Sequence, residues 1–176
     1  QDYGLGITTA NDGSIYIAGF STGNLDGKSN TGEGDAFIAK YDSDGAKVWT
    51  QLLGTPTHDS ASGITATSDG SIYITGTTSG NLDGKTNANP NSAFITKYSS
   101  DGVKAWTQLF AAGGHGIAAA SNGVAIVNSS SAGIFATQYN GDGVNTGSIL
   151  LSPEKNDSVT GINVTSDGSV LVAGYT

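Results

Sequence analysis

The chain has 176 residues, and its 7 Lys with no Arg stand against 15 Asp and Glu, which gives a formal net charge of −8. This length fits one domain, and an acidic chain without Arg is poorly suited to bind nucleic acid. The chain has no Cys, which excludes disulfides and thiolate chemistry, and no apolar run approaches the length of a membrane span.

Short runs of strand-like composition alternate with tight turns along the whole chain. The first two runs flank Asn-Asp-Gly at 11–13, and the next two flank Asp-Gly at 44–45. Asp-Gly and Asn-Gly between apolar runs are strong signals of β-hairpins, because glycine adopts the positive φ that such turns require. Equivalent turns follow at 68–70, 101–102, 121–123, 142–143 and 166–168. In the middle of the chain we expect four strands, over 63–67, 71–77, 93–98 and 103–109.

These runs belong to an internal repeat. Residues 12–19 return at 69–76, and residues 35–52 return at 92–109, both with an offset of 57 residues. A third, degenerate copy at 133–143 keeps the Phe, the Tyr and the Asp-Gly turn, but Gly147 stands where Trp49 and Trp106 stand in the first two copies. Self-similarity at a fixed period indicates a repeat architecture.

Four antiparallel strands per repeat predict an all-β fold, a β-propeller built of four-stranded antiparallel blades. A β-sandwich gives no reason for a 57-residue period, and a β-helix has shorter coils without two hairpins in each. The expected blades are 4–53, 61–110 and 114–151, followed by a half blade at 159–176. About three and a half blades do not close a ring, so we expect a piece of a longer chain, completed by the remaining blades of the parent chain or by another protein subunit.

The sequence D-A-F-I-A-K-Y-D-S-D-G-A-K-V-W-T-Q-L at 35–52, preceded by G-N-L-D-G-K at 23–28 and followed by D-S-A-S-G-I at 59–64, resembles the SBBP (seven-bladed β-propeller) repeat family. The third copy departs from it by losing the Asn-Leu-Asp-Gly insertion and the Trp. The resemblance implies a propeller in a bacterial extracellular or cell-surface protein, with no catalytic residue attached to the repeat.

The variable loops of such a propeller emerge on one face, where binding sites usually lie. The loops Asn24–Lys28 and Asn81–Lys85 make Asn24, Asp26, Asn81 and Asp83 candidate ligand-binding residues on that face. Asp26, Glu33, Asp35 and Asp83 are candidate Ca²⁺ ligands, although their spacing does not match a calcium loop. The alternative is a turn in which Asn and Asp bind their own backbone, with no cofactor.

The expected blade linkers, 54–62 and 111–116, hold the only two histidines. His58, Asp59 and His115 are therefore further candidate ligand-binding residues. His58, Asp59 and Ser60 have the residue types of a hydrolytic triad, but adjacent residues do not reach the relay geometry, so no catalytic residue is assigned.

The aromatic side chains at equivalent places in the repeats are interpreted as the core between blades, with sugar stacking as the alternative. Lys40, Lys47, Lys97 and Lys104 are interpreted as solvated outer positions or guards of edge strands.

Two functions follow from these observations. The first is a non-catalytic repeat scaffold of a bacterial extracellular or cell-surface protein, which mediates protein interaction or surface assembly. The second is a glycan-binding or Ca²⁺-dependent adhesive module that uses the two Gly-Asn-Leu-Asp-Gly-Lys loops. A hydrolase would require acids that converge at the centre of the propeller, and no such pair stands out in the sequence.

Overall fold

The computed structural model describes residues 1–176 except 88, 111–112, 154–157 and 176. Its strands form three four-stranded antiparallel sheets and one two-stranded sheet, in chain order. The first sheet is β1 (Asp2–Thr9), β2 (Ile15–Ser21), β3 (Asp35–Tyr41) and β4 (Lys47–Leu53). The second is β5 (Asp59–Ala66), β6 (Ile72–Thr78), β7 (Ser92–Tyr98) and β8 (Lys104–Phe110), with the short 3₁₀ turn η1 (Leu82–Gly84) between β6 and β7.

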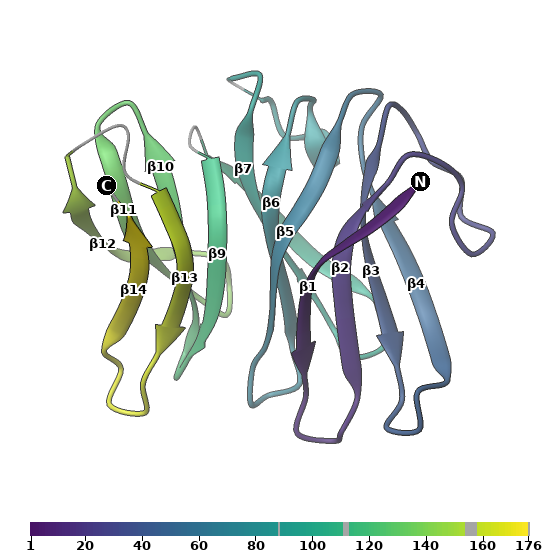
Figure 1. Ribbon diagram of the computed structural model, residues 1–176, viewed down its shortest axis with the longest axis horizontal. Coiled ribbons are helices and arrows are strands. Elements are labelled where there is room, and N and C mark those ends of the chain that lie inside the picture. Colours follow the sequence, from purple (N-terminus) through teal and green to yellow (C-terminus); the bar gives the residue numbers. More distant parts are fainter. Residues whose placement is uncertain (88, 111–112, 154–157, 176) are drawn as a thin grey trace.

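The third sheet is β9 (Gly113–Ala120), β10 (Gly123–Ser130), β11 (Gly133–Asn140) and β12 (Asn145–Ser152), and the fourth is β13 (Ser158–Val164) with β14 (Val170–Tyr175). The first strand of each sheet contacts the first strand of the next, from β1 through β5 and β9 to β13. Figure 1 shows the four in this order from right to left, with β2–β4 to the right of β1 and β14 to the left of β13. The predicted all-β fold, a partial propeller, is confirmed.

Two first strands begin earlier than the sequence indicated. β5 begins at Asp59 rather than at residue 63, and β9 already includes His115, so part of each expected linker is strand. Each of these strands contains a bulge, and the bulge of β5 lies between Ala61 and Gly63. A bulge inserts an extra residue and interrupts the alternation of side chains, which hid the first residues of the strand from a search for period two. Among the described residues, no helix is long and apolar enough to cross a membrane.

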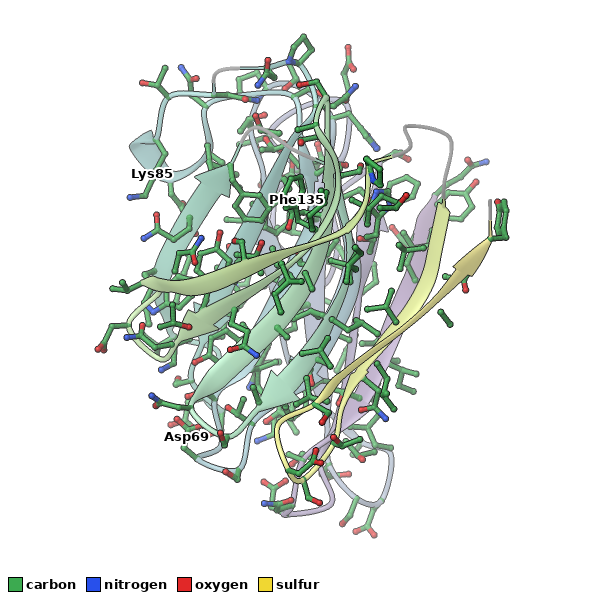
Figure 2. The ribbon with its side chains drawn as sticks, turned by 90° about the vertical axis from the view of Figure 1, so that its left-hand side faces the viewer. Asp69, Lys85 and Phe135 are labelled. Atoms are coloured by element: carbon green, nitrogen blue, oxygen red, sulfur yellow. The ribbon has the colours of Figure 1, made fainter. Side chains whose placement is uncertain are left out.

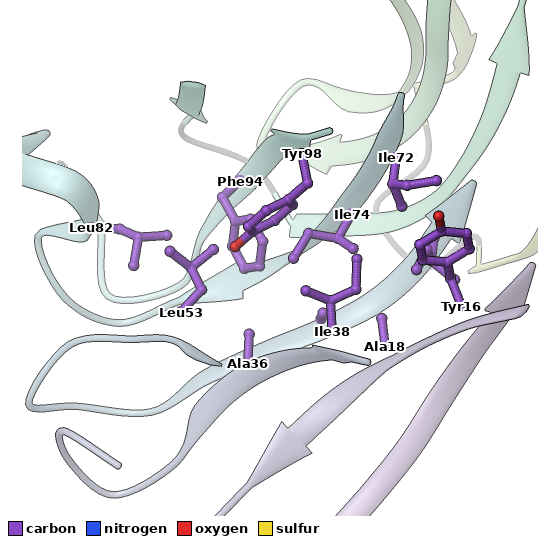
Figure 3. Packing of buried hydrophobic residues seen from close by; sticks show 12 residues of the cluster. Tyr16, Ala18, Ala36, Ile38, Leu53, Ile72, Ile74, Leu82, Phe94 and Tyr98 are labelled. Atoms are coloured by element: carbon purple, nitrogen blue, oxygen red, sulfur yellow. The ribbon is translucent and has the colours of Figure 1, made fainter. Parts of the chain in front are cut away.

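The hydrophobic core lies between neighbouring blades rather than within one. Figure 3 shows the contact of the first two blades, where Ile38 and Leu53 of the first blade pack in one buried cluster with Ile74 and Phe94 of the second. Leu82 of η1 joins this cluster and is fully buried. Because burial of each large aliphatic or aromatic side chain stabilises by roughly 1.5–3 kcal/mol, this contact fixes one blade against the next.

A polar and aromatic contact closes the outer side of the junction between the first two blades. Trp49 of β4 donates its indole N–H to the carbonyl of Ser100 in the next blade at 3.2 Å, and the Lys40 ammonium donates to the same carbonyl at 3.2 Å. The Trp49 ring packs against buried Tyr16, with ring centroids 5.9 Å apart, and Lys40 lies over the Tyr16 ring. We call this set the interblade clasp.

The second blade repeats the interblade clasp with Tyr73, Lys97 and Trp106, whose two donors reach the Gly141 carbonyl at 3.0 and 3.1 Å. Trp49 and Trp106 therefore occupy equivalent surroundings, as the repeat predicted, and the aromatic residues do form the contact between blades. The interpretation of Lys40 and Lys97 as solvated lysines was wrong, because both bind a carbonyl of the next blade.

Candidate functional site

Two ends of the propeller differ in character. The Asp-Gly hairpins lie at one end, where Figure 2 labels Asp69, and the long loops lie toward the other, where it labels Lys85. The β2–β3 and β6–β7 loops and the linkers between sheets form this second end, which we call the loop face. All the candidate site residues lie in its loops or in the strand ends beside them, so it is the place to search for a site.

The loop Asn24–Lys28 is held by its own side chains. Asn24 accepts a hydrogen bond from the backbone N–H of Asn30 at 3.0 Å, and Asp26 has a positive φ of 52°. The Asp26 carboxylate forms an ion pair with Lys47 and accepts a hydrogen bond from the Thr50 hydroxyl at 2.6 Å, both on β4. The hydrogen bond from Lys47 holds the pKa of Asp26 below its ordinary value.

The second loop repeats this arrangement. Asn81 accepts from the Asn87 N–H at 2.8 Å, and Asp83 has the same φ and binds Lys104 and Thr107 of β8. Lys47 and Lys104, expected as solvated residues, therefore pair with loop aspartates. In both blades the Asn binds the backbone of its own loop, as in the turn that the sequence left open, whereas the Asp carboxylate binds side chains of its own outer strand.

A different pair of carboxylates is buried between the first two blades. Asp35 at the start of β3 and Asp59 at the start of β5 are 1% and 0% exposed. The Oδ2 atom of each carboxylate accepts two hydrogen bonds from the Thr four residues earlier, one from its backbone N–H and one from its hydroxyl. The distances are 3.0 and 2.7 Å from Thr31 to Asp35, and 2.6 and 2.8 Å from Thr55 to Asp59. The Oδ1 atoms of both carboxylates have no hydrogen-bond partner.

The loops that carry these two carboxylates lie side by side. Asp59 donates its backbone N–H to the Gly34 carbonyl at 2.7 Å, and Gly34 and His58 form a parallel bridge. A Cβ on Gly54 would lie 2.1 Å from Asp35 Oδ1, so only glycine fits beside this carboxylate. Burial raises the pKa of Asp59, and the nearby Asp35 charge adds to the effect.

The two histidines have separate surroundings. The His58 ring packs edge-on against Phe20 with centroids 5.1 Å apart, and His115 shares a 2.7 Å hydrogen bond with the Ser129 hydroxyl. Glu33 is exposed, and it lies in the loop between Thr31 and Asp35. Within the described part of the chain, no three His, Cys, Asp or Glu side chains gather where they could hold a metal ion. The candidate Ca²⁺ ligands Asp26, Glu33, Asp35 and Asp83 are thus not assembled into one cluster.

A groove of about 500 Å³ opens beside the second blade's loop. Asp83, Lys85, Lys104, Trp106 and Gln108 line it, so it combines an aromatic ring with charged and amide side chains. This composition can stack and hydrogen-bond a polar ring such as a sugar. Asp83 is the residue that sequence reasoning had placed at a ligand site, whereas Lys85 and Gln108 were not predicted.

Sequence reasoning also missed the Thr–Asp loops. Thr31 and Asp35, like Thr55 and Asp59, are separated by three residues. That shared spacing was the available signal, but the two segments are not related to each other by the 57-residue offset, so the search for repeats did not align them.

The comparisons with known proteins agree with the observed fold. The fold is that of a partial β-propeller. Residues 48–83, from β4 to η1, match the SBBP beta-propeller repeat model, so the resemblance inferred from the sequence is confirmed for this segment.

A curated protein and a solved structure show what the chain is similar to. The regulatory protein FlaEY of Caulobacter vibrioides is 29% identical over 113 residues, which cover 56% of this chain and 12% of that protein. A crystal structure of a protein of unknown function from Bacteroides caccae covers 98% of this chain with a TM-score of 0.55 and 12% identity, and this chain spans 53% of its length. This likeness supports the fold alone.

Proposed function

We propose that the chain is a non-catalytic β-propeller scaffold in a bacterial extracellular or cell-surface protein, where it mediates protein interaction or assembly. The SBBP repeat is a structural repeat rather than a catalytic one, and the similar Caulobacter protein is described as a regulatory protein. Both fit a scaffold.

The observation that carries this proposal is the direction of the loop carboxylates. Asp26 and Asp83 bind the lysine and threonine of their own outer strands, and Asp35 and Asp59 bind threonines of their own loops. These side chains stabilise the loops instead of converging on a substrate. The exposed residues of the loop face include Lys28 and Lys85, which the first two blades share, and Glu33, which Pro90 replaces in the second blade. A rigid framework with variable exposed loops is suited to bind another protein.

The test reverses the exposed charges of the loop face in the parent protein. Lys28→Glu, Glu33→Lys and Lys85→Glu together leave the thermal unfolding of the chain unchanged, because these side chains make no buried contact. We expect a smaller fraction of the variant than of the wild type to be retained with the cell envelope. We also expect added protease to cleave a smaller fraction of the variant on intact cells. Equal retention and exposure of the variant would contradict a role for the loop face, and a wholly cytoplasmic wild-type protein would contradict the proposed location.

The groove beside Trp106 supports a second candidate, a glycan-binding or Ca²⁺-dependent adhesive module. Gln108→Ala and Lys85→Ala remove groove side chains without touching the interblade clasp. If this second function holds, a glycan array and calorimetric titration with Ca²⁺ detect binding by the wild type, and the two variants lose the glycan signal. Absence of both signals, with the same melting temperature in chelator and in Ca²⁺, removes this candidate and leaves the scaffold.

A further inference from the structure

The two buried carboxylates between the first two blades project from the same face of their loops. Gly34 and His58 form a parallel bridge, and a Cβ on Gly34 would lie 2.9 Å from the His58 ring, so these two positions share one face. Because successive residues of an extended chain point to opposite faces, Asp35 and Asp59 project together from the other face. The Asp59 N–H donates to the Gly34 carbonyl at 2.7 Å and keeps the two segments in this register.

Each of the two carboxylates has one oxygen without a partner. The Oδ2 atom of each is bound by a Thr of its own loop, whereas the Oδ1 atom of each is buried and accepts no hydrogen bond. In the described part of the chain, the ion pairs are those of Asp26 and Asp83, and neither Asp35 nor Asp59 takes part in one. Two neighbouring buried carboxylates without a counter-ion are unfavourable, because each charge is removed from water and repels the other.

The two loops nevertheless favour the charged form of both groups. Each Oδ2 atom accepts a backbone N–H and a hydroxyl, and such hydrogen bonds stabilise a carboxylate over a carboxylic acid. Glycine at position 54 leaves space beside the Oδ1 atom of Asp35, since a Cβ there would lie 2.1 Å from that atom. The loops therefore present two anionic oxygen atoms, on one face, beside a residue without a side chain.

We propose that Asp35 and Asp59 hold one Ca²⁺ ion between the first two blades, with the Oδ1 atom of each carboxylate as a ligand. A divalent cation balances the two negative charges. Ca²⁺ accepts carboxylate and carbonyl oxygens in flexible arrangements, whereas Mg²⁺ usually keeps several waters, for which two fully buried carboxylates leave little room. Because Asp35 belongs to the first blade and Asp59 to the second, the ion joins the two blades.

This site is separate from the long loops, and its residues are not repeated in the second blade. Asp26 and Asp83 bind lysines of their own blades. Ser92 stands 57 residues after Asp35, and its hydroxyl donates to the Asn87 side chain. A neutral group replaces one of the two carboxylates there, so we expect one ion per chain. The ion strengthens the scaffold from within and is independent of the surface by which the scaffold binds another protein.

The experiment measures thermal unfolding of the chain in Ca²⁺ and in chelator, together with calorimetric titration of Ca²⁺. We expect the wild type to bind one Ca²⁺ and to melt about 5 °C or more higher when Ca²⁺ is at about 100 times its dissociation constant. Asp35→Asn and Asp59→Asn each remove a charged ligand and should abolish both the heat and the shift. An unchanged melting temperature of the wild type, without heat of binding, would overturn the proposal.

The matched control is Asp2→Asn. Asp2 pairs with Ser21 as Asp59 pairs with Thr78, but it is exposed, so the control should keep the full Ca²⁺ shift. In chelator, burial and, to a smaller extent, the Asp35 charge raise the pKa of Asp59, so Asp59→Asn should then melt no lower than the wild type. A loss of the same size in Ca²⁺ and in chelator would show that the carboxylate is only a hydrogen-bond acceptor of its loop.

A measurement on the unmodified protein tests the same site if the variants do not fold. Ca²⁺ should slow hydrogen exchange of the Asp59 amide, which joins the two loops, by about tenfold or more. An equal effect of Na⁺ or Mg²⁺ would overturn the assignment to Ca²⁺, and a Ca²⁺ shift that Asp83→Asn abolishes would place the ion in the long loop instead. The scaffold is tested by retention at the cell envelope and the groove by glycan binding, so their failure and the failure of this inference are distinguishable.

Discussion

The first two blades and the third share a ladder of strands but differ in how they meet the next blade. Each of the first two carries a lysine and a tryptophan that bind the following hairpin, and a tyrosine ring against which both lie. The third has Ala125, Gln138 and Gly147 at those positions and still forms a four-stranded sheet with the same pairing. The comparison teaches that a blade forms without the clasp residues while its inner strands pack on the preceding blade. We expect the clasp residues to determine how firmly two blades are joined.

The largest expected effect is the loss of a clasp ring. Trp49→Ala removes the indole that packs on Tyr16 and donates to the Ser100 carbonyl, so we expect the free energy of unfolding to fall by about 3 kcal/mol. Denaturation in urea, with circular dichroism as the signal, measures it. A control on the outer strand of the third blade, Leu150→Ala, alters a half-exposed side chain and should lower stability by less than about 1 kcal/mol. Equal losses would mean that the clasp adds nothing to the junction.

The strands and turns could be predicted from the sequence because their signals are local. Residues 69–70 and 101–102 specify hairpins through glycines that the structure places at φ near +80°, and alternation marked most strands. The 57-residue period then predicted the blades. The early start of β5 escaped prediction because its bulge breaks the alternation at Ala61.

The contacts between blades were harder to predict. Nothing in the sequence around Lys40 indicates that its ammonium binds Ser100, 60 residues away, because that contact exists only after two blades pack together. For the candidate site, likewise, the sequence indicated the loops but not the contacts of their side chains. The sequence singled out the loops that contain Asp26 and Asp83, but their ion pairs with Lys47 and Lys104 depend on the curvature of each loop over its outer strand.

The second prediction uses two glycines at the same turn position. Gly45 and Gly102 both have a positive φ of about +80°, but a Cβ on Gly102 would lie 3.0–3.2 Å from the Trp49 ring, whereas one on Gly45 meets nothing. Gly45→Ala should cost about 1–2 kcal/mol for the backbone conformation alone. Gly102→Ala should cost about 1–2 kcal/mol more, because it also displaces the indole. If chemical denaturation gives the same loss for both, the ring does not depend on this close approach.

The third prediction concerns the lysine of the clasp. Lys97→Met keeps the aliphatic stem but removes the hydrogen bond to the Gly141 carbonyl and the contact with the Tyr73 ring, so we expect a loss of about 1 kcal/mol. Gln138→Met changes the equivalent, exposed position of the third blade and should leave the urea midpoint unchanged. A comparable loss from both variants would show that the lysine acts through its own strand and not through the next blade.

The smallest expected effect is the pH dependence of stability, which should have opposite signs for two carboxylates, the buried Asp59 and Asp167 in the turn between β13 and β14. Burial raises the pKa of Asp59 above its ordinary value of 3.8, whereas a hydrogen bond from the Thr165 hydroxyl, the largest of several causes, lowers the pKa of Asp167 to about 2. Asp59 therefore favours the folded chain while it is protonated, and that contribution is lost as the pH rises through its folded pKa. Asp167 favours the folded chain above pH 3.8, and that contribution is lost as the pH falls toward 2.

With asparagine at either position, the difference in stability from the wild type should change with pH, in opposite directions for the two variants. Relative to the wild type, Asp59→Asn should become more stable as the pH rises from about 3 to 7, because it lacks the buried charge. Asp167→Asn should become less stable over the same range, because it lacks the charged acceptor of the Thr165 hydroxyl. Urea denaturation at a series of pH values measures both differences in one experiment. Slopes of the same sign would show that Asp59 is as well solvated in the folded chain as a surface turn residue, which its lack of exposed area argues against.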